Sequence, residues 1–136
     1  MINSVAEYES IVEHEDNEVR RKANFEEASE QTWHAILEKR PDLAEEVAMN
    51  KKLPPGIIDQ LIVSGSSRSR SLVAMKRSLT HSQFQKLSSD QDESIRAMIA
   101  SNKKTPTTIL EALANDECVM VSNAARLQIQ NRQNVS

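Results

Sequence analysis

The chain has 136 residues and a formal net charge of −3, with 38% hydrophobic and 27% charged residues, a composition typical of ordinary globular proteins. It has one cysteine, no apolar run near the ~18 residues that a membrane span needs, and no signal-peptide pattern at its start. These features argue against a disulfide-stapled or membrane-spanning protein, and we expect a cytoplasmic location.

Apolar residues recur at helical spacing from the start of the chain. A first helix is expected from Ser4 to Glu13, with Ser4 as its N-cap, and a polar break at residues 14–17 ends it. A second helix buries Ala23, and Ser29 caps a third helix that carries Trp33. Because aromatic residues make up only 3% of the chain, the core has to be mostly aliphatic.

Prolines and a glycine mark the middle helices. Pro41 suits the first turn of a fourth helix, where its missing N–H donor is not needed. Pro54 and Pro55 start a fifth helix and Gly65 breaks it, and a sixth helix follows from about Ser67 to Arg77.

Four polar residues mark the remaining helices. Thr80 caps a seventh, Asp90 opens an eighth, Thr105 with Pro106 begins a ninth, and Asp116 caps a tenth. No stretch alternates with a period of two, so we expect no strands. The sequence predicts an all-α fold of ten short helices, arranged as about five antiparallel pairs.

One sequence frame occurs twice, as Asn50-Lys51-Lys52-Leu53-Pro54 and Asn102-Lys103-Lys104-Thr105-Pro106. The copies begin at residues 50 and 102, so they are 52 residues apart, which is two lengths of a 26-residue unit. Such a period is typical of solenoids. We expect a single domain, residues 1–136, with units of roughly 1–28, 29–52, 53–78, 79–104 and 105–132. The lysine pairs are expected at helix C-termini, where cations meet the negative end of the helix dipole. We favour this role over the alternative that the lysines bind a ligand.

Two segments carry a family pattern: Leu87-Ser88-Ser89-Asp90 before Ile95-Arg96 and Ile99-Ala100, and Leu113-Ala114-Asn115-Asp116 before Val121, Ala124, Ala125 and Leu127. They resemble HEAT repeats and the related leucine-rich-variant repeats, in which an Asp between paired helices and an Arg six residues later form a ladder. Asp90 and Arg96 match both positions, whereas Arg70 matches only the second, since Ser64 replaces the acid. The resemblance covers roughly residues 29–130 and implies a right-handed α-α superhelix, without implying any chemistry.

The sequence offers no set of catalytic or metal-ligating residues. His14, His34 and His81 are far apart, and none has a metal-ligand spacing to Cys118. The two glycines do not form a phosphate-binding loop. Adjacent carboxylates point in different directions around a helix and make poor acid–base pairs. We therefore expect no enzyme activity, no metal and no cofactor.

Charge is divided unevenly along the chain. Residues 1–50 hold 13 acids and 5 bases, for −8, whereas residues 51–136 hold 7 acids and 12 bases, for +5. Such blocks are often only solvated helix faces, but a field of one sign also raises the rate of encounter with an opposite partner. The acidic half therefore predicts a basic protein partner.

A compact acidic solenoid is similar in architecture to immunity proteins of bacterial polymorphic toxin systems, including contact-dependent inhibition. That similarity implies an inhibitor that covers the basic active site of a toxin, such as a nuclease. The expected electrostatic contacts are Glu13, Glu15, Asp16, Glu18, Glu45 and Glu46. Trp33 is the expected apolar contact if it is exposed, although Trp33 and Tyr8 are better explained as core residues.

Two alternatives remain open. A nucleic-acid-binding module would use the basic residues Arg68, Arg70, Lys76, Arg77, Arg96, Lys103 and Lys104. The sequence pI of about 5.6 and the scarcity of aromatics to stack on bases argue against it. The third possibility is a scaffold or adaptor subunit, which the sequence neither supports nor excludes.

Overall fold

The computed structural model describes residues 1–134, and the regular elements in that range are helices. The β-structure described there is one isolated parallel bridge between Ile2 and Ala28, so the predicted all-α class is confirmed. The chain divides into two compact units, unit 1 (Met1–Val73) and unit 2 (from Ala74 on), and each is described by itself. Along residues 1–134, no helix has the length and apolar character that a membrane crossing requires.

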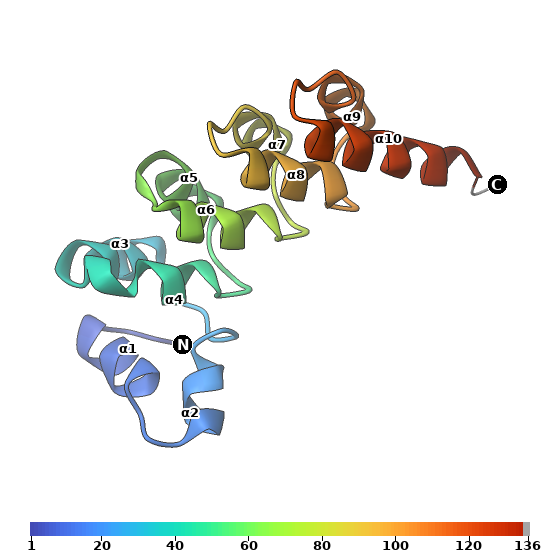
Figure 1. The fold of residues 1–136 in the computed structure, drawn as a ribbon. Helices are drawn as coiled ribbons and strands as arrows, with labels where there is room; N and C mark the ends of the chain where they lie inside the picture. The colour runs from blue at the N-terminus through green and yellow to red at the C-terminus, as the bar shows by residue number, and fades with distance from the viewer. Residues whose placement is uncertain (135–136) are drawn as a thin grey trace. The chain divides into compact units, whose positions relative to one another are not determined.

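Unit 1 is built from short helices joined by tight connections. They are α1 (Val5–Val12), α2 (Asn17–Lys22), α3 (Glu30–Lys39), the 3₁₀ helix η1 (Pro41–Leu43), α4 (Ala44–Ala48) and α5 (Pro55–Ser64), and α6 (Ser67–Ala74) runs to the unit boundary. Helix α1 packs against α2 and α3, and α3 packs against α4 and α5 (Figure 1).

The polar and proline signals of unit 1 act where the sequence predicts. The Ser4 and Ser29 side chains accept hydrogen bonds from backbone N–H groups in the first turns of α1 and α3, which satisfies donors that a helix start leaves without a partner. Pro41 begins η1 and Pro55 begins α5. Gly65 ends α5, where its N–H donates to the Leu61 carbonyl over 2.9 Å.

An aromatic pair fills the core between the first helices. Tyr8 and Trp33 are both 0% exposed, and their rings meet edge to face with centroids 5.6 Å apart, a geometry that aromatic quadrupoles favour. Burial, and secondarily the nearby Glu46 carboxylate, raise the pKa of Tyr8 above its ordinary range. The expectation that both rings are core residues is confirmed.

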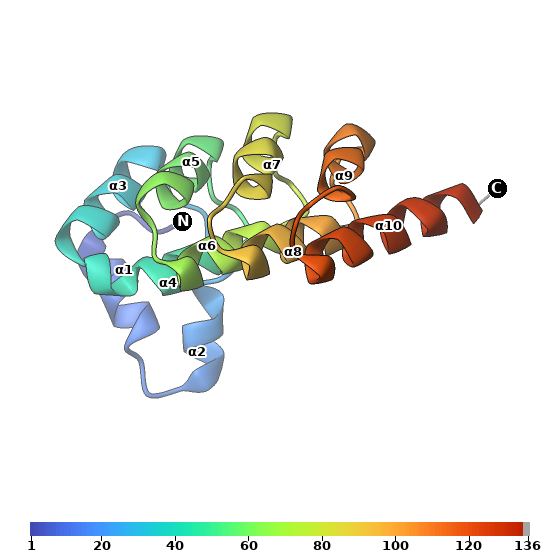
Figure 2. The ribbon, with the colours of Figure 1, turned by 45° about the horizontal axis from the view of Figure 1, so that its top comes forward.

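The described residues of unit 2, 74–134, form four helices in two layers: α7 (His81–Ser88), α8 (Glu93–Ser101), α9 (Thr107–Leu113) and α10 (Val119–Asn134). Helices α7 and α9 lie in one layer and α8 and α10 in the other (Figure 2). The buried apolar residues between them are aliphatic apart from Phe84. The fully or nearly fully buried ones include Phe84, Leu87, Ile95, Ile99, Ala100, Leu110, Val121 and Ala125.

Helix starts in unit 2 differ in part from the prediction. Thr80 caps α7 through a reciprocal capping box with Gln83, as expected. Asp90 does not open α8, because Asp92 is its N-cap, and the Asp90 carboxylate instead accepts from the Asp92 N–H. Asp116 likewise lies before α10 and accepts from the Cys118 N–H over 2.9 Å. Both aspartates therefore shape the turn that leads into the helix.

Asn50 is the structural centre of the first repeated frame. Its side chain is 0% exposed, and Nδ2 donates to the carbonyls of Ala23 over 2.7 Å and Glu26 over 2.8 Å. Its Oδ1 accepts from the Lys52 N–H over 2.7 Å. Ala23 is the C-cap of α2, so the amide satisfies a carbonyl that the helix end leaves without an intrahelical partner.

Asn102 repeats this arrangement in unit 2. Its Nδ2 donates to the carbonyls of Ala74 over 2.9 Å and Lys76 over 2.8 Å, and its Oδ1 accepts from the Lys104 N–H over 2.9 Å. Gln128, 26 residues later, donates in the same manner to the carbonyls of Ala100 and Asn102. In each of these three places, a polar side chain thus donates to backbone carbonyls that lie about one repeat unit earlier in the chain.

The lysine pairs lie just beyond the C-termini of α4 and α8, where the sequence predicts them. Helix α4 ends at Ala48 and α8 at Ser101, and neither has a basic residue in its last turn. The lysines lie in the turns beyond and are exposed to solvent, whereas the asparagine before them carries the buried hydrogen bonds. The predicted position of the pairs at helix C-terminal ends is confirmed, and their interaction with the helix dipole stays a prediction.

Arg96 and Asp116 join α8 to the turn before α10. The guanidinium donates to both carboxylate oxygens, over 2.9 Å from Nε and 3.2 Å from Nη2, and Nη1 donates to the Asp90 carbonyl. The two side chains are only 14% and 11% exposed. This pair lowers the pKa of Asp116 and raises that of Arg96, mainly through the hydrogen bonds between them.

Candidate partner-binding surface

Arg40 gathers three carboxylates at one point of unit 1. Its Nη1 donates to Glu9 and, over 2.8 Å, to Glu13, while Nε and Nη2 make a paired contact with both oxygens of Asp42 at 3.0 and 2.9 Å. These contacts join the end of α1 to η1. The hydrogen bonds from Arg40 lower the pKa of Asp42, and the three carboxylates together raise the pKa of Arg40.

Glu45 and Glu46 extend this acidic group along α4. They follow Asp42 by three and four residues, so all three side chains lie on one side of the η1–α4 segment, and all three are exposed. We name the group formed by Glu9, Glu13, Asp42, Glu45 and Glu46 the acidic surface. Three of its five carboxylates contact the Arg40 guanidinium. The unit that holds it carries 14 acidic and 9 basic residues, a formal net charge of −5.

The other predicted acidic contacts lie between α1 and the first turn of α2. Glu15 and Asp16 precede α2 and Glu18 lies in its first turn, and all three are exposed. Asp16 is the N-cap of α2, and Arg20 holds the loop by donating to the carbonyls of His14 and Glu15. Asp16 therefore has a structural task in addition to its charge.

The acidic surface differs from the predicted set at two positions. Of the six acids expected from the sequence, Glu13, Glu45 and Glu46 belong to it, and the structure adds Glu9 and Asp42. The helical spacing of Asp42 to the glutamate pair could have indicated its place. Glu9 could not be found this way, because Arg40 recruits it from 31 residues away.

Trp33 does not belong to an exposed surface. The side chain is 0% exposed and packs against Tyr8. The expectation that Trp33 is an apolar contact with a partner depended on its exposure, and it is therefore wrong. The ring contributes by holding α1 and α3 together beneath the acidic surface.

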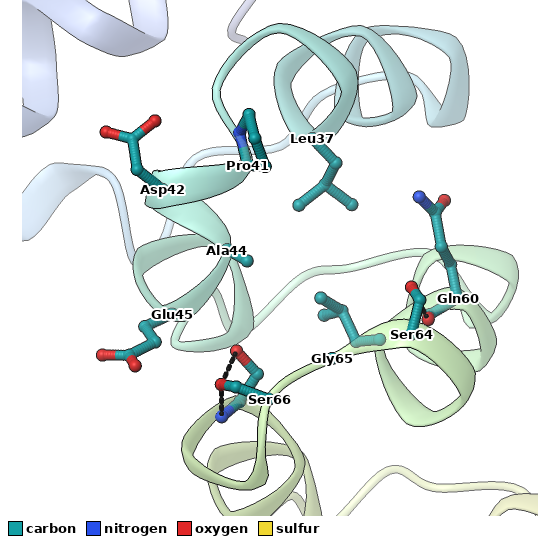
Figure 3. Close-up of a pocket in the computed structure, with 11 residues that line it drawn as sticks. Leu37, Pro41, Asp42, Ala44, Glu45, Gln60, Ser64, Gly65 and Ser66 are labelled. Atoms are coloured by element: carbon teal, nitrogen blue, oxygen red, sulfur yellow. Dashed lines mark hydrogen bonds between the residues drawn. The ribbon is translucent and has the colours of Figure 1, made fainter.

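A cavity of about 360 Å³ lies beside the acidic surface within unit 1. Asp42 and Glu45 extend from η1 and α4 on one side of it, and Gln60 and Ser64 lie on α5 on the other (Figure 3). Its wall is mixed, with apolar and hydroxyl side chains from Leu37, Pro41, Ala44, Leu61, Ser64, Ser66 and Ser69. The acidic surface is thus bordered by a hollow that could receive a side chain.

The basic residues of the nucleic-acid alternative are in different environments. Arg68, Arg77, Lys103 and Lys104 are exposed, and Arg70 and Lys76 are partly exposed. Arg70 donates to the Gly65 carbonyl over 2.7 Å. Arg96 is paired with Asp116 in a largely buried contact, so it cannot contribute to an exposed basic surface. In unit 2, the Asn102 hydrogen bond to the Lys76 carbonyl brings the basic turn at residues 76–77 near the end of α8.

No three His, Cys, Asp or Glu side chains within residues 1–134 are grouped in a way that could hold a metal ion. Comparison with known proteins adds no family to this description: no family model, no curated protein and no solved structure matches the chain.

Proposed function

We propose that the chain is a non-catalytic protein-binding module whose acidic surface binds a basic protein partner. The observation that carries the proposal is that Arg40 holds three carboxylates, Glu9, Glu13 and Asp42. Two further exposed carboxylates, Glu45 and Glu46, follow Asp42 along η1 and α4. Arg40 can neutralise only one of these five charges. A surface with this excess of carboxylates attracts cations and raises the rate of encounter with a basic protein.

The partner in this proposal is the nuclease domain of a toxin, which the chain neutralises as an immunity protein does. A nuclease has a basic groove because it must attract phosphates, and carboxylates held on short helices can occupy that groove in place of the nucleic acid. The cavity bordered by Asp42, Glu45 and Gln60 gives a side chain of the partner a place to insert. Buried anchors of this kind carry most of the affinity in protein interfaces.

The proposed architecture is a right-handed superhelix of five helix pairs, similar to HEAT repeats. Its support is the recurrence of the same contacts: Asn50, Asn102 and Gln128 each bond carbonyls 24 to 28 residues earlier. The Arg96 contact to Asp116, which lies 26 residues after Asp90, agrees with the ladder that such repeats have. Small-angle scattering that requires a globule instead of an elongated, curved particle would remove this part of the proposal.

Charge reversal on α4 tests the function. The wild-type chain is immobilised and used to capture a partner from a lysate of its host at low salt, and the captured protein is identified, purified and assayed for nuclease activity. We expect a basic nuclease that the chain inhibits. The double variant Glu45→Lys with Glu46→Lys should associate about 10-fold or more slowly at low salt, with the difference shrinking as salt is raised.

The control variant makes the same change of charge away from the acidic surface. Glu111→Lys with Glu117→Lys alters two exposed acids of unit 2. It should keep the wild-type association rate within about 2-fold, since neither residue belongs to the acidic surface and salt screens charges outside the interface. Equal slowing by both double variants would mean that only net charge matters. Capture of RNA or DNA without any protein would instead favour the nucleic-acid alternative and sink the proposal.

A further inference from the structure

Unit 2 carries an exposed apolar groove that the proposed function does not use. The groove has a volume of about 370 Å³ and is lined by Met75, Arg77, Met98, Ser101, Asn102 and Lys103. Met75 is 58% exposed and Met98 is partly exposed. Its volume is at the lower end of the range for ligand pockets, about 300–1,000 Å³, which suits one or two inserted side chains.

Methionine is unusual in this chain because none of the five residues is buried. A flexible thioether side chain is well suited to filling irregular gaps in a core, and its use on a surface is typical of sites that adapt to an apolar partner. Met75 and Met98 are not among the buried core residues of unit 2. Exposed apolar side chains that line one groove are typical of an interaction site.

Asn102 builds the groove as well as the fold. Its Nδ2 donates to the carbonyls of Ala74 and Lys76, the residues on either side of Met75. These hydrogen bonds fix the backbone that carries Met75 beside the end of α8, which carries Met98. The two methionines are thus held at the same groove by a buried polar contact, and the groove is already formed in the unbound protein.

The charged residues at the groove are all basic. Arg77 and Lys103 line it and are exposed, whereas none of the lining residues is Asp or Glu. Arg132 adds a second guanidinium near this edge, because its Nη2 donates to the Lys103 carbonyl over 2.9 Å. An apolar floor with a cationic edge complements a ligand that presents an apolar side chain next to carboxylates.

A nucleic acid fits this groove less well than a peptide. Binding of single strands relies on aromatic side chains for base stacking, and the aromatic residue of unit 2, Phe84, is 3% exposed. The methionine floor offers apolar contact to an aliphatic side chain instead. The basic edge alone would attract phosphates, but a phosphate would make no use of the apolar surface of Met75 and Met98.

We propose that this groove docks a short acidic segment of a protein partner, with an aliphatic side chain between Met75 and Met98 and flanking carboxylates against Arg77 and Lys103. This is the helix-in-groove mode of recognition, in which an amphipathic helix places its apolar face in a groove. The site is separate from the acidic surface, since it lies in unit 2 and selects the opposite charge. Either proposal can therefore fail while the other holds.

Methyl NMR on the full chain tests this site. Labelling with ¹³C-methyl methionine gives one signal for each of five residues, assigned by single Met→Leu variants. The probe is a 12-residue acetylated and amidated peptide with leucines at helical spacing and glutamates between them. We expect the Met75 and Met98 signals to shift on titration and the Met1 and Met49 signals to stay unchanged.

Matched peptides and variants of the chain separate the contributions of apolar contact and of charge to peptide binding. Replacing the leucines of the peptide with serine should weaken binding about 10-fold or more, because one buried leucine is worth about that factor, and replacing its glutamates with lysine should abolish binding. Met75→Gln with Met98→Gln should lose binding, as should Arg77→Glu with Lys103→Glu. Met120→Gln, which changes a methionine that is 51% exposed outside the groove, should bind as the wild type does.

Several outcomes would overturn the proposal. Equal binding of the lysine peptide would remove the role of the basic edge, and equal loss in Met120→Gln would mean non-specific apolar adsorption. If oligothymidine shifted the Met75 and Met98 signals while the acidic peptide did not, the groove would be a nucleic-acid site. Shifts of the same signals with protein concentration alone would identify a second copy of the chain as the occupant.

Discussion

Asn50 and Asn102 make equivalent hydrogen bonds in the two halves of the chain. Each donates twice to backbone carbonyls near the end of an earlier helix and accepts once from the N–H two residues ahead. An amide can fill this position because it combines two donors with an acceptor on one short side chain. The repeated sequence frame therefore corresponds to a buried polar contact, in which the second lysine of each pair takes part through its backbone N–H.

Replacing either asparagine with alanine should lower the free energy of unfolding by about 3 kcal/mol, because each change leaves buried carbonyls and an N–H without partners. Urea denaturation followed by circular dichroism measures the effect. Asn123→Ala changes an exposed asparagine on α10 and should shift stability by no more than about 0.5 kcal/mol. Similar losses in all three variants would show that the buried contacts contribute nothing specific.

Asp116 should make stability depend on pH in the acid range. Arg96 lowers the pKa of Asp116 in the folded state, so the folded state holds this proton less tightly than the unfolded chain does. The stabilisation is present above the unfolded pKa of about 3.9 and is lost as pH falls through the folded value. Asp116→Asn should lower stability at pH 7 and flatten the curve below about pH 4. The measurement is thermal unfolding from pH 7 to pH 2, and a parallel wild-type curve would contradict the assignment.

The two glycines should respond oppositely to alanine. A Cβ at Gly65 would lie 2.3 Å from the Leu61 carbonyl oxygen, which is backbone and cannot rotate away, so Gly65→Ala should cost about 1–3 kcal/mol. A Cβ at Gly56 meets only the carboxylate end of Glu30, a flexible exposed side chain. Because Gly56 lies in α5, Gly56→Ala should be neutral or stabilise by up to about 1 kcal/mol. Equal melting temperatures for the two variants would contradict the close approach at Gly65.

Tyr8→Phe should leave the free energy of unfolding unchanged or raise it by about 1 kcal/mol. The Tyr8 hydroxyl is buried without a hydrogen-bond partner in the part of the chain that the structure describes, so its removal relieves a desolvation penalty. Trp33→Leu is the contrasting change, since it leaves a void at the aromatic contact and should lower stability by about 3 kcal/mol. A marked loss in Tyr8→Phe, measured by urea denaturation, would mean that the hydroxyl does have a partner.

Local signals predicted the helices well. Ser4, Ser29, Thr80, Pro41 and Gly65 act where the sequence placed them, because capping and proline geometry depend on a few neighbouring atoms. The roles of Asp90 and Asp116 were misjudged, since an aspartate can shape the turn before a helix as easily as it can cap one. Helical spacing does not reveal where a packing partner ends: Val121 and Ala125 of the family pattern are fully buried, yet Leu127 is 59% exposed.

The candidate surfaces were less accessible to sequence analysis. The acidity of the first half is visible in composition, but the Arg40 contacts depend on a fold that brings residues 9, 13 and 42 to one guanidinium. The groove of unit 2 depends in the same way on Asn102, whose bonds reach back 26 and 28 residues. Residue patterns along a single sequence do not predict contacts between residues that are far apart in that sequence.

Trp33, a buried core residue of unit 1, gives this unit a spectroscopic signal of its own. It is the one tryptophan of the chain, so intrinsic fluorescence excited at its absorption edge follows the unfolding of unit 1 alone, while circular dichroism sums the helices of both units. The two denaturation curves coincide if the chain unfolds as one cooperative system and separate if it does not. The packing that removes Trp33 from the surface thus provides an internal reporter for one half of the protein, with no label added.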